Sequence, residues 1–179
     1  MRPRPTIEAF DRHLAALGLR LDAVVIGGSA LALLGVTTRQ TRDFDILAPE
    51  LPREIADAAR EFAQAQRRLG IDLMDDWLNN GPMQVGDVLP EAWQLRTRPV
   101  FEGRALVLTT LGRKDLLKTK LFALCDRGID LLDCVELAPT LAELEEAVFW
   151  LAEQDANPDW PAHVRATIAD LSQRLDHGL

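Results

Sequence analysis

The sequence predicts a mixed α/β fold of the α+β class, because strand patterns and helix patterns are segregated along the chain. Runs rich in strand-forming residues occur only in the first 111 residues, beginning with the apolar run at residues 23–26. From about residue 112 onward, apolar residues recur at helical spacing. We therefore expect a sheet-containing core over residues 1–111 and a helical region over residues 112–179 that packs on this core.

The first half of the core alternates helices and strands. Apolar residues three and four positions apart predict helices over residues 6–18 and 52–69. The β-branched run at residues 23–26 predicts a buried strand, and a short helix is expected to follow it from Ser29. Polar and apolar side chains alternate over residues 43–47, which predicts a half-buried strand.

The second half of the core carries weaker patterns. Residues 71–74 alternate as a short strand would, and residues 94–101 and 104–110 predict a hairpin of edge strands. In the C-terminal region, Thr140 and Glu143 have the spacing of a capping box, which predicts that a helix begins there.

Composition limits the classes of function. A chain of 179 residues suits one compact domain, and a net charge of -8 argues against a protein that coats nucleic acid. The two cysteines, Cys125 and Cys134, lack the paired spacing of a zinc site. No apolar stretch has the length of a signal core or a membrane span, so we expect a cytoplasmic protein with no membrane partner.

Two acidic residues on one predicted strand are candidate metal ligands. Successive strand side chains point to opposite faces, so Asp43 and Asp45 project together while Phe44 and Ile46 face the apolar layer. Two adjacent carboxylates repel each other unless a cation lies between them, and Mg²⁺ prefers such hard oxygen ligands. A solvated pair on an edge strand would have the same sequence pattern.

A glycine-rich turn precedes these acids. Gly27 and Gly28 allow the backbone to approach a ligand closely, and the helix expected after Ser29 would present free N–H groups to phosphate. The alternative is a tight strand-to-helix turn in which the glycines serve packing alone. No Gly-x-Gly-x-x-Gly pattern is present, which disfavours dinucleotide binding.

The order of these motifs resembles a known superfamily. The strand, the Gly27-Gly28-Ser29 turn, the short helix and the strand of Asp43-Phe44-Asp45 all fall within residues 23–47. This arrangement resembles the signature of nucleotidyltransferases related to polymerase beta, closest to AbiEii-type and related bacterial nucleotidyltransferase toxins. Such relatives have a small mixed sheet of about four to six strands flanked by helices, which the resemblance implies here too.

The resemblance also implies an activity and residue roles. Members transfer a nucleoside monophosphate from an NTP to a hydroxyl, with two Mg²⁺ ions in the active complex. The acceptor would be RNA such as tRNA, or protein, and a toxin would have a cognate antitoxin as partner. The implied roles are metal binding by Asp43 and Asp45, a third catalytic carboxylate at Asp72, and nucleotide binding by Gly27, Gly28, Ser29, Arg42, Lys120 and Arg127.

Two alternatives remain open from the sequence. The first is a catalytically inactive nucleotidyltransferase-like module that serves binding or an antitoxin role, and absence of the third acid would favour it. The second is an unrelated α/β protein whose Asp-x-Asp is fortuitous.

Overall fold

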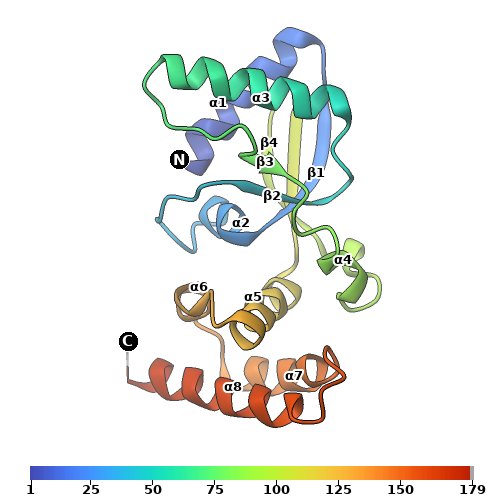
Figure 1. Ribbon diagram of the computed structural model, residues 1–179, viewed down its shortest axis with the longest axis vertical. Helices are drawn as coiled ribbons and strands as arrows, with labels where there is room; N and C mark the ends of the chain where they lie inside the picture. Colours follow the sequence, from blue (N-terminus) through green and yellow to red (C-terminus); the bar gives the residue numbers. More distant parts are fainter. Residues whose placement is uncertain (178–179) are drawn as a thin grey trace. The chain divides into compact units, whose positions relative to one another are not determined.

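A computed structural model describes residues 1–177 of the chain. The chain divides into two compact units, Met1–Gly112 and Arg113–Leu179. The strands of the described residues all belong to the first unit, and the second unit is built from helices (Figure 1).

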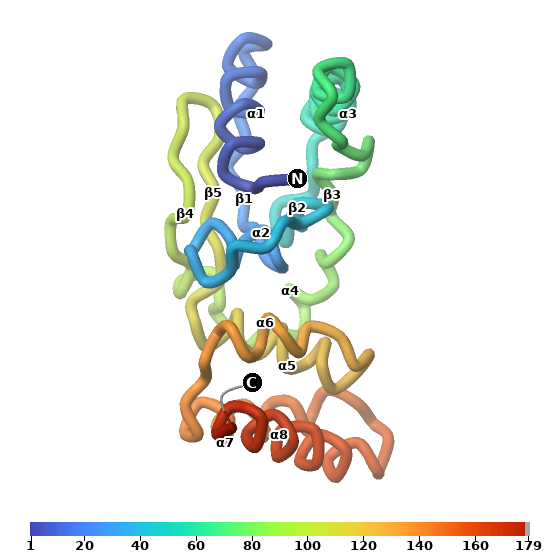
Figure 2. Tube along the Cα trace, turned by 90° about the vertical axis from the view of Figure 1, so that its left-hand side faces the viewer, coloured from blue at the N-terminus to red at the C-terminus, as the bar shows by residue number. Residues whose placement is uncertain are grey.

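The first unit contains a five-stranded mixed sheet with the strand order β3-β2-β1-β5-β4. Figure 2 shows this order across the sheet. Strand β1 lies at the centre, antiparallel to β2 and parallel to β5, while β2 and β3 are parallel and β4 and β5 are antiparallel. The mixed sheet confirms the predicted fold class. The strands are β1 (Leu21–Ile26), β2 (Phe44–Ala48), β3 (Leu78–Asn79), β4 (Arg98–Glu102) and β5 (Leu106–Thr110).

Helices α1, α2 and α3 bury one apolar core against this sheet. Helices α1 and α3 contact each other, and four rings meet in the core: Phe10, Phe44, Phe62 and Trp77. The Phe10 and Trp77 ring centroids are 5.1 Å apart at an interplanar angle of 89°, the edge-to-face arrangement that aromatic pairs favour. The helices are α1 (Pro3–Leu17), α2 (Gly27–Leu33), α3 (Arg53–Arg68), α4 (Val85–Val88) and the 3-10 helix η1 (Trp93–Arg96).

The prediction of a strand at residues 71–74 is wrong. These residues have no regular structure, and the Arg67 guanidinium donates a hydrogen bond to the Leu73 carbonyl. On the side away from β1, strand β2 pairs with β3, which begins one residue after Trp77. The apolar alternation at 71–74 instead reflects a loop that buries only the Leu73 side chain.

The predicted hairpin is present but its first strand is shorter than expected. Residues 93–96 form η1, so β4 begins at Arg98. Strand β5 hydrogen-bonds to β1 as well as to β4, so of the two hairpin strands only β4 is an edge strand. The side chain of Asp11 holds the hairpin turn, because its Oδ1 accepts hydrogen bonds from the Ala105 and Leu106 amides at 2.8 and 2.9 Å.

The second unit contains four helices in the described residues: α5 (Arg113–Arg127), α6 (Leu131–Glu136), α7 (Leu141–Ala152) and α8 (Trp160–Asp176). The predicted capping box is confirmed at the start of α7, where the Thr140 hydroxyl accepts from the Glu143 amide and Glu143 accepts from the Thr140 amide. Helices α7 and α8 pack side by side (Figure 1). Across residues 1–177, none of the helices combines the length and apolar character that a membrane crossing requires.

Candidate active site

The turn Gly27-Gly28-Ser29, here called the glycine corner, lies directly against Asp45, one of the two acids. Residue Ile26 at the end of β1 pairs with Asp45 on β2, which brings the following Gly27 beside that carboxylate. A Cβ atom placed on Gly27 would lie 2.6 Å from Oδ2 of Asp45, closer than any real side chain tolerates. Gly27 also has a φ of +75°, a conformation that L side chains rarely adopt. Glycine is therefore required here for two independent reasons.

The second glycine faces the segment that leads to the other acid. A Cβ on Gly28 would lie 3.6 Å from Oγ1 of Thr41, which is an ordinary contact. The Thr41 hydroxyl lies 3.1 Å from the Asp43 carbonyl and 3.5 Å from Asp43 Oδ1. Thr41 thereby fixes the turn that delivers Asp43 to the start of β2.

Asp43 and Asp45 lie on the polar face of this segment. Phe44 and Ile46 are fully buried, whereas the two acids are half-buried. Strand alternation places both carboxylates on the face opposite the two apolar side chains. The structure thus brings the predicted glycines and the predicted acids together in one place.

Ser29 is part of the corner itself. Its side chain is 1% exposed, and its hydroxyl donates to the Ile26 carbonyl at 3.2 Å. Helix α2 begins at Gly27, two residues before the predicted start, so the backbone N–H groups of residues 27–29 belong to its first turn. The first N–H groups of a helix have no intrahelical partner and attract anions.

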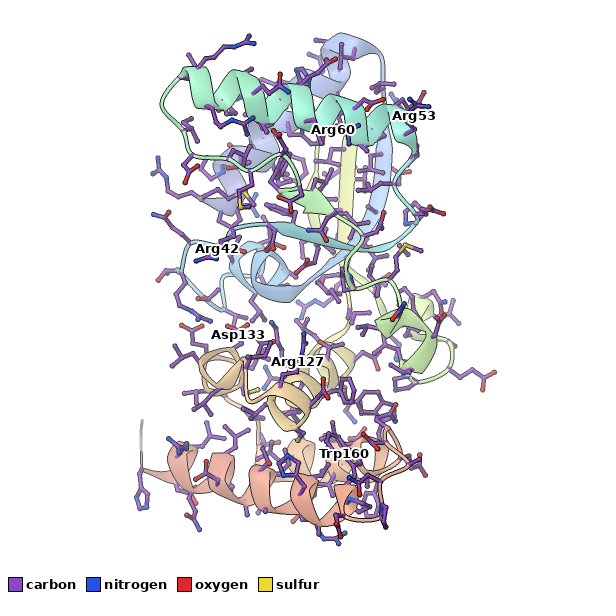
Figure 3. The ribbon with its side chains drawn as sticks, in the orientation of Figure 1. Arg42, Arg53, Arg60, Arg127, Asp133 and Trp160 are labelled. Atoms are coloured by element: carbon purple, nitrogen blue, oxygen red, sulfur yellow. The ribbon has the colours of Figure 1, made fainter. Side chains whose placement is uncertain are left out.

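Arg42 immediately precedes the acidic pair. Its side chain is exposed, and Figure 3 labels it on the segment between α2 and β2. Its guanidinium is therefore accessible to an anion such as phosphate.

A comparison with protein families places these motifs in a known group. Residues 6–141 match the family described as "Nucleotidyltransferase of unknown function (DUF6036)". The chain belongs to this nucleotidyltransferase family. Searches of the curated proteins and of the solved structures found no match. The family match covers the glycine corner and both acids, and it supports the superfamily part of the resemblance without singling out AbiEii-type toxins.

In this nucleotidyltransferase, the structure does not unite Asp72 with the acidic pair. Asp72 is exposed in the irregular loop at residues 71–74, so the strand that was expected to direct it toward the site does not exist. Within residues 1–177, no three His, Cys, Asp or Glu side chains are grouped as a metal site would require.

The residue beside Asp45 on the next strand is Asn79, which sequence reasoning missed. Strands β2 and β3 run parallel with Asp45 in register with Asn79. Paired residues of neighbouring strands project from the same face of a sheet, so Asn79 lies on the face of the two carboxylates. No local sequence pattern identifies Asn79, because β3 is only two residues long.

The second unit of this family member holds Lys120 and Arg127 in different environments. Lys120 is 5% exposed, and its Nζ lies 3.0 Å from Asp130 Oδ2 and 2.6 Å from Asp133 Oδ2. Arg127, the last residue of α5, has a 62% exposed side chain that lies 3.5 Å from Asp126 (Figure 3). The two residues implied together by the resemblance therefore differ, one buried in an ion-paired cluster and the other exposed at the end of α5.

The donor set at the glycine corner fits a magnesium ion. Mg²⁺ in proteins is commonly held by one or two carboxylates, with substrate phosphates and water completing its shell. Asp43 and Asp45 supply two carboxylates on one face, and Gly27 adds no side chain of its own beside Asp45. Asp43 and Asp45 would hold the metal.

Proposed function

We propose that the chain is a Mg²⁺-dependent nucleotidyltransferase that moves a nucleoside monophosphate from an NTP to an acceptor hydroxyl. The observation that carries this proposal is the contact between Gly27 and the Asp45 carboxylate, which sets a phosphate-compatible backbone corner against an acidic strand. The membership in a nucleotidyltransferase family supports the same class of chemistry.

Each residue of the corner has a distinct part in this proposal. The backbone N–H groups of Gly27, Gly28 and Ser29 bind phosphate oxygens of the NTP, and Arg42 adds a cationic contact. Asp43 and Asp45 hold up to two Mg²⁺ ions, which would lower the charge on the phosphates and polarise the acceptor hydroxyl.

The reaction is an in-line displacement at the α-phosphorus. The acceptor oxygen forms a new bond to phosphorus, its proton passes to solvent, and pyrophosphate leaves as the old P–O bond breaks. The chain contributes mainly by holding the triphosphate rigid against the two carboxylates, because positioning and charge stabilisation dominate phosphoryl-type transfers.

The acceptor and the biological role follow from the resemblance. We propose RNA such as tRNA, or a protein side chain, as the acceptor, and a toxin role with a cognate antitoxin as partner. The resemblance also proposes nucleotide contacts by Lys120 and Arg127, and Lys120 would first have to leave Asp130 and Asp133.

A second candidate function is a nucleotide-binding module that performs no transfer. The observation that favours it is that the described residues contain no grouping of three potential metal ligands. Such a module would bind Mg²⁺ and NTP at the same corner and would act through a partner, as an antitoxin-type component does.

Transfer of label from four α-³²P-labelled NTPs tests the proposal. The purified chain is incubated with Mg²⁺, bulk tRNA and total cell protein, and label is followed into RNA and protein. We expect label transfer by the parent, loss of transfer in the Asp43→Asn/Asp45→Asn double variant, and full transfer in Asp22→Asn, which removes an exposed acid at the other end of β1. Equal labelling by the parent and the double variant would refute it, and NTP binding without transfer would favour the module.

A further inference from the structure

A pocket lies in the first unit, at the end of the sheet where β1 begins. Its volume is about 610 Å³, a size typical of small-molecule sites. Its lining comes from the last turns of α1, the link between α1 and β1, and the turn between β4 and β5. Figure 2 shows the end of α1 and the β4–β5 turn at the same end of the sheet. Three separate segments of the chain therefore meet around one hollow.

Hydrogen bonds hold these three segments in place. The Asp11 carboxylate of α1 accepts from the Ala105 amide of the β4–β5 turn at 2.8 Å, and the Leu21 amide at the start of β1 donates to the Ala105 carbonyl at 2.9 Å. The chain leaves α1 through Gly18, whose φ is +70° and whose amide donates to the Ala15 carbonyl at 3.2 Å. The pocket is thus part of the fold itself, and a ligand does not have to order it.

Each segment contributes one arginine to the lining: Arg12 from α1, Arg20 from the link and Arg104 from the turn. All three residues are exposed. Within residues 1–177, no ion pair holds any of them, and the Asp11 carboxylate that attracts Arg104 already accepts backbone hydrogen bonds. Three like charges around one hollow repel each other, and an anion between them relieves that repulsion. In a chain of net charge -8, this pocket is a local reversal of sign.

The rest of the lining is apolar. It consists of the small residues Ala15, Ala16, Gly18 and Ala105, together with Leu19. Sites of this kind, apolar apart from a few charged groups, are typical of organic ligands. The lining therefore fits a molecule that joins a ring to a strongly anionic group.

We propose that this pocket, here called the arginine pocket, binds a small organic diphosphate of the class of a nucleoside diphosphate, without a metal ion. Three guanidiniums balance the charge of a diphosphate, which is about three negative charges near neutral pH. The six residues of β1, roughly 20 Å at the rise of a strand, separate Arg20 from Gly27. The arginine pocket is therefore distinct from the glycine corner and does not depend on the function proposed for that corner.

Calorimetry with ADP in the presence of EDTA tests the arginine pocket directly. The chelator removes divalent ions, so binding that needs a metal is not measured. We expect ADP to bind, AMP to bind about tenfold more weakly because one phosphate is lost, and adenosine to show no measurable binding. Absence of ADP binding, or equal affinities for ADP and adenosine, would overturn the inference.

The double variant Arg20→Gln/Arg104→Gln tests the location. Both side chains are exposed, so the fold should persist, and the affinity for ADP should fall by at least about tenfold. The matched control is Arg68→Gln/Arg165→Gln, which removes the same charge at two exposed positions outside the lining and should leave the affinity unchanged. Equal losses in the two double variants would reduce the effect to net charge and would overturn the inference.

Arg42→Gln separates the arginine pocket from the glycine corner. Because Arg42 lies beside the acidic pair, its loss should not change ADP binding in EDTA. Loss of ADP binding in Arg42→Gln, with binding kept in Arg20→Gln/Arg104→Gln, would place ADP at the glycine corner and overturn the inference. The proposed function is judged separately, by Mg²⁺-dependent label transfer, so failure of one leaves the other standing.

A short single-stranded RNA tests the other source of clustered phosphates. RNA binding should be weak in the same buffer, and Arg20→Gln/Arg104→Gln should change it no more than the control double variant does. RNA that binds more tightly than ADP, and that loses affinity in Arg20→Gln/Arg104→Gln alone, would overturn the proposal of a small ligand in favour of a nucleic-acid backbone.

Discussion

The molecule contains two pairs of aspartates that differ in what stands beside them. Asp43 immediately precedes β2 and Asp45 lies on β2, both half-buried, with Gly27 against the Asp45 carboxylate. Asp130 and Asp133 lie three residues apart at the start of a helix, with the Lys120 ammonium within 3.0 Å of both. The Lys120 ammonium lies against the second pair, and the backbone of Gly27 lies against Asp45 of the first pair.

This difference shows why a pair of carboxylates cannot be interpreted from spacing alone. Both spacings place the two acids on a shared face, one at a strand period and one at a helix period. What distinguishes the pairs is the neighbour supplied by another part of the chain. A lysine that is itself buried makes the second pair structural, because removing either partner would leave an uncompensated charge.

The largest expected effect concerns the first pair. Asp45→Asn removes one metal ligand while keeping the side-chain shape, so label transfer should fall by about 10²- to 10³-fold. The melting temperature should change little, because the side chain is half-buried and isosteric. Transfer activity and thermal unfolding of the same sample check both expectations. An Asp45→Asn variant with a lowered melting temperature and full activity per folded molecule would show that Asp45 is structural and not functional.

The second prediction concerns the pair around Lys120. Lys120→Met leaves Asp130 and Asp133 facing an apolar side chain, and the free energy of unfolding should fall by about 3–5 kcal/mol. Urea unfolding of the parent and the variant measures this loss. Lys114→Met is the matched control, because Lys114 forms an exposed pair with Glu146 and its loss should have no measurable effect. A small effect at both lysines would contradict a structural role for Lys120.

The third prediction compares the two glycines of the corner. Gly27→Ala forces a side chain into a left-handed backbone position and into Asp45, which should cost about 1–3 kcal/mol and lower transfer. Gly28→Ala makes only an ordinary contact with Thr41 and should be tolerated in stability. Chemical unfolding and the transfer assay report both quantities. Equal effects at the two positions would show that the Gly27–Asp45 contact is not special.

The smallest expected effect lies in the second unit. Hydrogen bonds from Arg113, followed by the Thr140 amide, lower the pKa of Glu143 from 4.5 to about 2. Because the folded pKa lies below the ordinary value, this carboxylate stabilises the fold above pH 4.5, and that stabilisation is lost as the pH falls toward 2. Glu143→Gln should lower the free energy of unfolding by about 1 kcal/mol near neutral pH. It should also weaken the fall of that free energy as the pH drops below 4.5. Glu145→Gln, at an exposed neighbouring position, should leave the pH dependence of the free energy of unfolding unchanged.

The parts of the fold that carry strong local patterns could be predicted. Alternation identified the strand of Asp43 and Asp45, helical spacing identified most helices, and the capping box located the start of α7. Strand β3 could not be predicted, because two residues are too few to show a period. Its partner is chosen by the burial of Trp77, which depends on tertiary packing.

The site was predictable to a similar degree. The glycines and the acidic pair are neighbours through one strand pairing, between β1 and β2, so their order in the chain was informative. Asn79 lies in register with Asp45 through a strand that local sequence does not reveal, and the strand expected around Asp72 is absent. The burial of Lys120 was likewise hidden, since its aspartate partners follow ten and thirteen residues later on another helix.

The binding of an NTP with Mg²⁺ to the parent and to Asp45→Asn, measured by calorimetry, tests the central claim most directly. That claim is that the corner at Gly27 and the carboxylates on β2 form one nucleotide and metal site. The account predicts Mg²⁺-dependent NTP binding by the parent and a loss of at least about tenfold in affinity in the variant. Equal affinities in the two proteins, with or without Mg²⁺, would contradict it.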